Sequence, residues 1–341
     1  MTVPNRPVDR SSGPDVVRAA VVQAAPIAFD RERTLERVAQ LTAGAAADRA
    51  QLVVFPEAFV SGYPKGADFG AVVGSRSSEG REWFRRYHDS SVDIPGPAVE
   101  RLCEIARVNA VHLVVGVIER ARGTLYCTVV LVGPDGRLLG KHRKLMPTAS
   151  ERLIWGFGDG STIPVVATPL GRIGAVICWE NYMPQLRLAM YEQGIELYCA
   201  PTVDDRETWL STMRHIALEG RCFVLSANQF SRRSDYPPDY PVETTGPDAV
   251  LISGGSCIVD PLGQVMAGPA RNGETILVAD LDLGQIARGK FDLDVVGHYA
   301  RPDIFRLVVN GARQEPVSWE SASADRFGHP GVLGKEVAER D

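Results

Sequence analysis

Apolar runs of strand length alternate with segments of helical spacing along the chain, and this alternation predicts an α/β fold. The first unit has an apolar run at residues 16–25, a helical pattern at residues 31–48 and a second apolar run at residues 51–55. Apolar side chains in the middle segment recur every three or four residues, as on one face of a helix. A strand–helix–strand unit of this kind implies parallel strands with the helix packed on their sheet.

The same order recurs in the second half of the chain. Apolar runs at residues 173–178, 195–200 and 222–227 are separated by helical patterns at residues 184–193 and 207–219. A helix is also expected at residues 97–109, followed by strands at 111–119 and 125–132, and the last two strands are expected at 255–260 and 275–281. Pro134-Asp135-Gly136 is a strong turn signal that predicts an antiparallel hairpin. We therefore expect one α/β domain built from two similar βα halves.

The remaining stretches are polar or rich in Gly and Pro. We expect a flexible tail at residues 1–15, a domain at residues 16–310 and a polar tail at residues 311–341. Residues 60–93 are too long for a plain connection, so we expect them to form loops around a pocket. Residues 228–253 are also expected to be loop, closing over a site or mediating assembly.

Composition narrows the class of protein. In 341 residues, 45% hydrophobic and 23% charged side chains are typical of a soluble globular protein. A formal net charge of −5 gives no support for a nucleic-acid or anionic-membrane partner. No apolar run is long enough to span a membrane or to serve as a signal peptide, so we expect a cytoplasmic protein. The six cysteines form no C-x-x-C pair, which argues against a zinc or dithiol site.

Three reactive side chains lie at the ends of predicted strands or in adjoining loops. Glu57 and Cys178 follow apolar runs, and Lys144 lies in a polar stretch after the predicted hairpin. A carboxylate can take a thiol proton, a thiolate can attack an electron-poor carbon, and an ammonium can stabilise the charge that develops. Each residue also has a structural interpretation, as a turn cap, a solvated lysine or a buried core cysteine. Spacing alone does not bring the three together.

The segments that hold these residues resemble the nitrilase superfamily of carbon–nitrogen hydrolases, and its true nitrilase branch in particular. They are FPEAFVSGYP at residues 55–64, HRKLMPT at 142–148 and CWEN at 178–181. Residues 151–156, 158–161, 206–223 and 297–303 also look nitrilase-like, so the likeness covers roughly residues 16–305. All the motifs occur in the order of the family, which is far more specific than one short match.

The resemblance implies an α-β-β-α sandwich in which Glu57, Lys144 and Cys178 converge, with Glu151 positioning the lysine and the substrate. It implies that Glu57 acts as base while Cys178 adds to a nitrile carbon to give a thioimidate. Lys144 would stabilise the developing charge, with help from the backbone N–H of Trp179. One water then displaces ammonia, and a second releases the carboxylic acid from a thioester. This chemistry needs no metal or organic cofactor.

Several neighbouring side chains are expected to have supporting roles. Tyr63, Trp155 and Trp179 adjoin reactive residues and are predicted to contact the substrate, although aromatic side chains are more often packing groups. Glu180 and Asn181 are predicted to hydrogen-bond locally and fix the turn that presents Cys178.

Other functions remain open at this stage. An amidase or N-carbamoyl-amino-acid hydrolase would use the same triad, a cyanide-hydrating relative is possible, and a non-catalytic assembly protein could keep the same fold. A redox thiol protein is disfavoured because no resolving cysteine lies near Cys178 in the sequence. The resemblance also implies homodimers that build larger helical oligomers or filaments, with residues 184–193 and 207–219 as the dimer surface.

Overall fold

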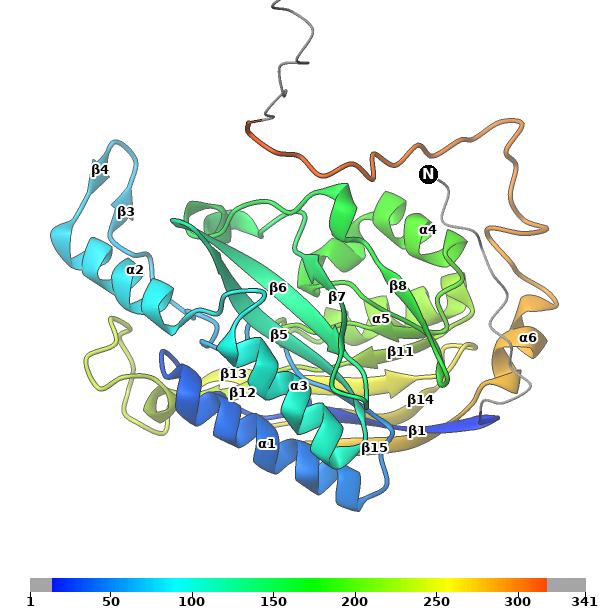
Figure 1. Cartoon of the computed structure of the whole chain (residues 1–341), viewed down its shortest axis with the longest axis horizontal. Helices are drawn as coiled ribbons and strands as arrows, with labels where there is room; N and C mark the ends of the chain where they lie inside the picture. The colour runs from blue at the N-terminus through cyan, green and yellow to red at the C-terminus, as the bar shows by residue number, and fades with distance from the viewer. Residues whose placement is uncertain (1–13, 318–341) are drawn as a thin grey trace, which may run out of the picture.

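Two β-sheets lie face to face, with helices on both outer faces (Figure 1). The computed structural model describes residues 14–317. The expected N-terminal tail at residues 1–13 and the expected C-terminal tail at residues 318–341 lie outside the described residues. Residues 311–317 are exposed and form neither helix nor strand.

The first sheet has the strand order β15-β1-β2-β5-β6-β7. Strands β1, β2 and β5 run parallel, and β6, β7 and β15 pair antiparallel with their neighbours. The bounds of its strands are β1 (Val16–Gln23), β2 (Leu52–Val54), β5 (His112–Ala121), β6 (Thr124–Val132), β7 (Leu138–Arg143) and β15 (Thr275–Asp282). The predicted hairpin at Pro134-Asp135-Gly136 is therefore the β6–β7 connection.

The second sheet repeats the parallel core of the first, with the order β12-β13-β11-β10-β9-β8 and β14 paired to β13. Strands β9, β10 and β11 run parallel. The bounds are β8 (Val165–Thr168), β9 (Gly171–Ala175), β10 (Leu197–Cys199), β11 (Phe223–Ser226), β12 (Phe230–Arg232), β13 (Val250–Val259) and β14 (Val265–Arg271). The expectation of two similar halves in one domain matches this arrangement.

Four helices complete the outer layers. They are α1 (Arg31–Ala47) and α3 (Pro97–Asn109) on the first sheet, and α4 (Pro184–Glu192) and α5 (Thr208–Gly220) on the second. Asp30 caps α1 by accepting a hydrogen bond from the backbone N–H of Arg33, which satisfies a donor that the helix leaves unpaired. Pro97 occupies the first turn of α3, where its missing N–H is not needed.

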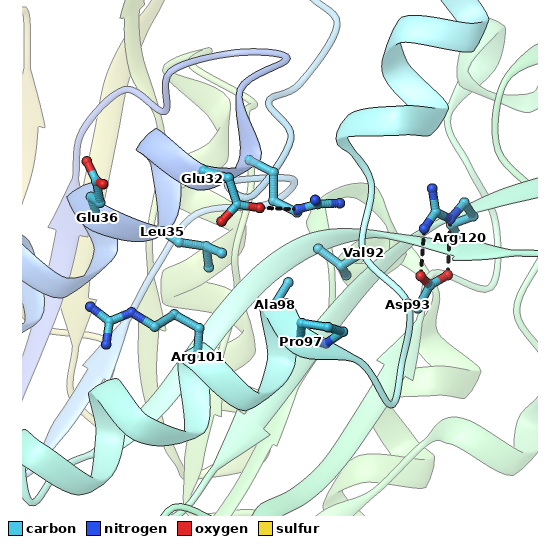
Figure 2. A pocket seen from close by; sticks show the side chains of 10 residues that line it. Glu32, Leu35, Glu36, Val92, Asp93, Pro97, Ala98, Arg101 and Arg120 are labelled. Carbon is cyan, nitrogen blue, oxygen red and sulfur yellow. Dashed lines mark hydrogen bonds and ion pairs between the residues drawn. The ribbon is translucent and has the colours of Figure 1, made fainter.

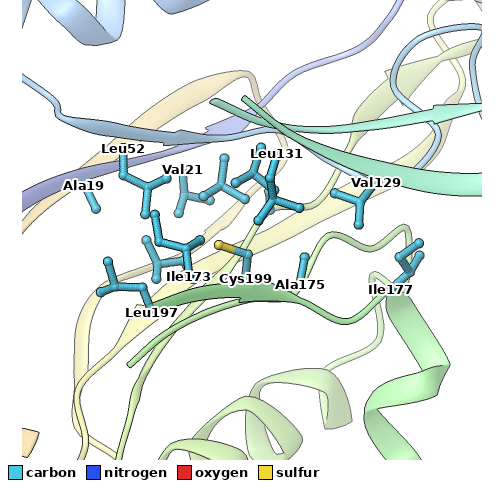
Figure 3. Packing of buried hydrophobic residues seen from close by; sticks show 14 of the residues in the cluster. Ala19, Val21, Leu52, Val129, Leu131, Ile173, Ala175, Ile177, Leu197 and Cys199 are labelled. Carbon is cyan, nitrogen blue, oxygen red and sulfur yellow. The ribbon is translucent and has the colours of Figure 1, made fainter. Parts of the chain in front are cut away.

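Strand alternation divides the apolar side chains among three layers. One face of each sheet packs against the other sheet, with side chains such as Val21, Leu131 and Ile173 between them (Figure 3). Val53 and Leu102 belong to the cluster between the first sheet and its helices. An equivalent cluster lies between the second sheet and α4 and α5. The α-β-β-α sandwich is confirmed.

The predicted loop at residues 60–93 is wrong in part, because it contains a helix. Strands β3 (Ala71–Val72) and β4 (Ser75–Arg76) form a small hairpin, and α2 (Ser78–Ser90) follows it. Most side chains of α2 are polar, and its buried large side chains are Trp83 and Tyr87. Two buried aromatic residues one turn apart, in an otherwise polar segment, give too weak a hydrophobic periodicity for the helix to be predicted from the sequence.

Several further elements were not expected. Strand β8 precedes the strand that leads to Cys178, β12 lies in the stretch predicted as loop at residues 228–253, and β14 and α6 (Gly284–Lys290) follow later in the chain. The β14 sequence, VMAGPAR, has no alternation of apolar and polar residues, and its pairing with β13 shifts register three times. Such an irregular strand has no pattern that sequence analysis can detect.

The segment that carries Glu57 lies directly on β5. Backbone N–H groups of Phe55 and Val60 donate to the carbonyls of Val114 and Gly116, at 2.8 and 3.0 Å. A Cβ atom at Gly116 would lie 2.2 Å from the Pro56 carbonyl oxygen and 2.8 Å from the Cα of Glu57. Backbone atoms at these distances have no room for a methyl group, so Gly116 permits this close approach.

Replacing Gly116 by Ala should therefore lower the free energy of unfolding by about 1–3 kcal/mol, the usual range for overpacking. Chemical denaturation measures it. Gly123→Ala is the matched control, since nothing lies within 4 Å of a Cβ atom there. A Gly116→Ala protein with the midpoint of the control would contradict the packing described here.

Candidate active site

Glu57, Lys144 and Cys178 come together at one end of the core between the sheets. Glu57 follows β2, Lys144 follows β7 directly and Cys178 follows β9. All three are buried, and Cys178 belongs to the apolar cluster between the sheets. The sequence placed each residue at a strand end or in a loop, and the fold brings these positions to the same place.

The ammonium of Lys144 bridges two carboxylates. Its Nζ lies 2.6 Å from Oε1 of Glu57 and 2.7 Å from Oε2 of Glu151. Burial by itself lowers the pKa of Lys144, but the charges of Glu57 and Glu151 outweigh that effect and raise the pKa well above its ordinary value. Lys144 is therefore a fixed positive charge inside the protein.

The carboxylate of Glu57 has one oxygen engaged and one free. Oε1 accepts from Lys144 and from the thiol of Cys127, whose Sγ lies 3.5 Å away. Oε2 is buried without a hydrogen-bond partner among the described residues. Burial raises the pKa of Glu57, and the opposing charge of Lys144 reverses this only in part. The backbone carbonyl of Glu57 is held from the second sheet by Nε2 of Gln229, at 2.8 Å.

Glu151 lies on the short helix η2 (Ala149–Leu153) and accepts three hydrogen bonds. Besides Lys144, its donors are the backbone N–H of Thr148 at 2.6 Å and the hydroxyl of Tyr63 at 2.8 Å. The Thr148 contact caps the start of η2, so the turn itself aims the carboxylate. Glu151 thereby gives the ammonium of Lys144 a second carboxylate in a fixed position.

The predicted substrate-binding aromatics divide into two groups. Tyr63 and Trp155 belong to the cluster, with their rings edge to face at 5.7 Å and the Lys144 Nζ 5.5 Å from the centre of the Trp155 ring. Trp179 is 41% exposed, its indole N–H donates to Asp204 at 2.9 Å, and the Arg206 guanidinium stacks on its ring. The side chain of Trp179 therefore faces the surface beside the buried cluster.

Cys178 begins the short helix η4 (Cys178–Tyr182) with a φ of +50°, in the left-handed region. A non-glycine residue there carries a cost on the order of 1–3 kcal/mol, and such residues concentrate at functional sites. The side-chain amide of Asn181 donates to the carbonyls of Cys178 and Val176, at 2.7 and 3.0 Å. The N–H of Cys178 donates to the Pro201 carbonyl at 2.8 Å. These bonds hold the turn that presents the thiol.

A hydroxyl group points at the sulfur. Oγ1 of Thr202 donates to Sγ of Cys178 at 3.1 Å and accepts from the backbone N–H of Asp204 at 3.0 Å. A hydroxyl has one hydrogen and two lone pairs, so Thr202 can accept from that N–H and donate to the sulfur at the same time. Burial and the charge of Glu57 raise the pKa of Cys178, whereas Lys144 and Thr202 lower it in part. The net rise keeps the thiol neutral at rest.

Sequence reasoning missed three side chains in contact with this cluster. They are Cys127, Thr202 and Gln229. Thr202 lies just beyond the carboxyl end of β10, so the strand-end argument that singled out Glu57 and Cys178 applied to it as well. Cys127 lies inside the apolar run predicted as a strand at residues 125–132, and Gln229 lies in the stretch predicted as loop at residues 228–253, so neither position indicated a role in the site.

No group of three or more His, Cys, Asp or Glu side chains within residues 14–317 is arranged to hold a metal ion. In the same described stretch, no helix is long and apolar enough to cross a membrane.

A separate cavity of about 470 Å³ lies between α1 and α3, on the outer side of the first sheet (Figure 2). Four of its charged lining residues form two ion pairs, Arg31 with Glu32 at 2.9 Å and Arg120 with Asp93 at 2.6 Å. Leu35, Val92 and Ala98 form its apolar part. It contains none of the reactive side chains described above.

Comparison with known proteins gives the family. The model of the carbon–nitrogen hydrolase family matches residues 18–291. The chain is 59% identical over 313 residues to a bifunctional nitrilase/nitrile hydratase NIT4A of Lupinus angustifolius, covering 90% of each chain. It is 59% identical over 302 residues to an aliphatic nitrilase of Sinorhizobium fredii (strain HH103), covering 88% of this chain and 97% of the relative.

Solved structures agree with the fold. A carbon–nitrogen hydrolase from Helicobacter pylori G27 superposes with a TM-score of 0.66 at 21% identity, covering 85% of this chain and 97% of that one. Nit3 of Saccharomyces cerevisiae, a member of branch 10 of the nitrilase superfamily, superposes with a TM-score of 0.65 at 23% identity, covering 83% and 96%. At these identities the likeness concerns the fold alone. From the family match and the curated relatives, the chain belongs to the carbon–nitrogen hydrolase family, among its nitrilases.

Proposed function

We propose that this protein hydrolyses an organic nitrile to the carboxylic acid and ammonia through a covalent intermediate on Cys178. The observation that carries the proposal is the buried Lys144 ammonium, held between Glu57 and Glu151 beside the thiol. The choice of nitriles rests on the relatives at 59% identity, which are named as nitrilases.

The first step joins the sulfur to the nitrile carbon. Glu57 takes the thiol proton as the bond forms, because its second carboxylate oxygen is buried without a hydrogen-bond partner among the described residues and is free to accept that proton. Thr202 stabilises the sulfur as it becomes anionic. Negative charge develops on the nitrile nitrogen, where the Lys144 ammonium and the backbone N–H of Trp179 stabilise it. Glu57 then passes the thiol proton to that nitrogen, which gives a neutral thioimidate and returns Glu57 to its ionised form.

Two waters complete the reaction. Glu57 takes a proton from the first water as the water oxygen adds to the thioimidate carbon and relays the two protons of that water to the nitrogen, so that the carbon–nitrogen bond breaks and ammonia leaves to give a thioester. A second water then adds, the carbon–sulfur bond breaks, and the acid departs as the proton returns to Cys178. The atoms balance as one nitrile and two waters giving one carboxylic acid and one ammonia. Lys144 remains an ammonium throughout, since its raised pKa keeps it charged.

The other predicted residues take positioning or binding roles in this scheme. Glu151 holds Lys144, and Tyr63 holds Glu151. We assign the walls of the substrate site to Tyr63 and Trp155, and contact with the outer part of the substrate to the exposed ring of Trp179.

Wild-type protein should release ammonia from nitriles, and Cys178→Ala should release none because the covalent intermediate cannot form. The measurement is ammonia release from a panel of aliphatic and aromatic nitriles and their matching amides. Turnover of amides alone would overturn nitrile specificity and establish an amidase with the same triad. Equal ammonia from wild type and variant would exclude Cys178 as nucleophile. No ammonia from any compound would favour the assembly protein.

Thr202→Val should reduce kcat/KM about tenfold, because a hydrogen bond to a charged group contributes about 1.5 kcal/mol. Steady-state kinetics on the best nitrile measures this. The control is Thr42→Val, which removes a buried hydroxyl without a hydrogen-bond partner on α1 and should leave kcat/KM unchanged. Equal kinetics for both variants would show that the Thr202 hydroxyl does not assist the sulfur.

We further propose that the protein is a cytoplasmic homodimer from which larger oligomers are built. The described residues include all six cysteines, and each is a free thiol, as expected in a reducing compartment. Helices α4 and α5 expose Leu188 and Leu218, at 36% and 39%, and η4 exposes the ring of Tyr182. Exposed apolar side chains on the elements of this outer layer support a contact with a second copy.

The double variant Leu188→Glu/Leu218→Glu should shift the protein from dimer to monomer, because four carboxylates would face one another across the contact. Sedimentation velocity measures the change. Val108→Glu, at a 66% exposed position on α3 of the opposite outer layer, is the control. An unchanged sedimentation coefficient in the double variant would exclude this face.

A further inference from the structure

The carboxylate of Glu180 connects the two chain segments that carry the lysine and the nucleophile. Glu180 is buried on η4, two residues after Cys178. Its Oε1 accepts from the backbone N–H of Leu145, the residue after Lys144. Its Oε2 accepts from the backbone N–H of Ile177, the residue before Cys178, at 3.0 Å. One side chain thus bonds to the immediate neighbour of each reactive residue.

His142 completes the group on β7. Its Nε2 lies 3.1 Å from Oε2 of Glu180, and its Nδ1 contacts the backbone carbonyl oxygen of Thr162. A carbonyl oxygen and an ionised carboxylate only accept hydrogen bonds, so both ring nitrogens must carry hydrogen. The geometry therefore indicates an imidazolium paired with a carboxylate. Burial alone lowers the pKa of His142, but the charge and hydrogen bonds of Glu180 outweigh it and raise the pKa.

The two residues that flank His142 on β7 are charged, and both pair with a carboxylate other than Glu180. Lys141 and Arg143 both pair with Glu119, a buried carboxylate on β5, through contacts of 2.6 and 2.5 Å. Side chains alternate along a strand, so the face of β7 that carries His142 meets Glu180 from η4 and the uncharged Thr162 carbonyl. The Glu119 group and the Glu180 group therefore lie on opposite faces of β7. Of the two, the Glu180 group bonds to the turn that carries Cys178, through the backbone N–H of Ile177.

We propose that Glu180 and His142 are positioning residues that set the separation of Lys144 and Cys178 during the reaction. The inference rests on the proposed function, since that reaction supplies its kinetic readout. Without the carboxylate, the N–H groups of Leu145 and Ile177 and the ring of His142 lose their shared acceptor. Each unpaired buried donor costs about 1–3 kcal/mol, so the two segments would separate to find other partners. A displacement near 1 Å at a reacting group reduces the rate about a hundredfold.

The test is Glu180→Gln, which keeps the shape of the side chain and removes its charge. We expect kcat to fall about 10- to 100-fold with KM changed less than about threefold, because alignment for chemistry is lost while the substrate site stays intact. His142→Gln should show the same split. The double variant should be no slower than Glu180→Gln alone, because two members of one unit are not additive.

Glu119→Gln is the matched control. It neutralises a carboxylate that is equally buried and also pairs with side chains of β7, but that makes no bond to the Cys178 turn. We expect it to lower the unfolding temperature and leave kcat within about twofold of wild type. A Glu180→Gln protein with the kcat of this control would show a purely structural role and overturn the proposal.

If Glu180→Gln does not fold, the kinetics of His142→Gln decide by the same criterion. A measurement on the unaltered protein tests the ion pair independently. A nitrogen-15 NMR titration should show the ring of His142 losing its proton at a higher pH than a free imidazole, because its pKa is raised. A ring that loses its proton at or below the pH of a free imidazole would overturn the proposed ion pair. Wild-type protein without turnover would refute the proposed function instead, and would leave the NMR result standing.

Discussion

The site depends on one electrostatic arrangement, a buried ammonium between two buried carboxylates. Removing ions from water is expensive, and their mutual attraction offsets that cost only when the geometry is good and the remaining lone pairs are hydrogen-bonded. Lys144 meets that condition through Glu57 and Glu151, whose own positions are fixed by Gln229, Thr148 and Tyr63. The charge is therefore in place before any substrate arrives, and no reorganisation of water is needed when charge develops.

The sandwich supplies this arrangement because its strands end at one place. Glu57 comes from the first sheet, Cys178 and Thr202 come from the second, and the helices on the outer faces make no direct contribution. Two rigid layers thus hold the base and the nucleophile from opposite sides. A single sheet would place both at one edge, with less control of the distance between them.

The sequence predicted those site residues that follow an apolar run or belong to a short motif. Glu57 and Cys178 follow apolar runs, and the motifs around them identified the family, so the fold and six members of the buried cluster could be predicted. Gln229 could not, because its hydrogen bond to Glu57 joins residues 172 positions apart and depends on how the sheets meet. The outward direction of the Trp179 ring was equally hidden, since it depends on Asp204 and Arg206. Helix α2 was missed because its burial rests on two aromatic side chains.

The antiparallel pairing of β15 with β1 has a consequence for synthesis on the ribosome. Val16 pairs with Asp282, so the outer edge of β1 is covered only after β15 has been synthesised. Until then β1 presents an open row of backbone donors and acceptors, and open strand edges are prone to pairing with other chains. Contacts so distant in sequence also form slowly. The sheet that supplies Glu57 and Lys144 is therefore complete only after most of the polypeptide has left the ribosome, and nascent chains that stop before β15 carry the aggregation risk.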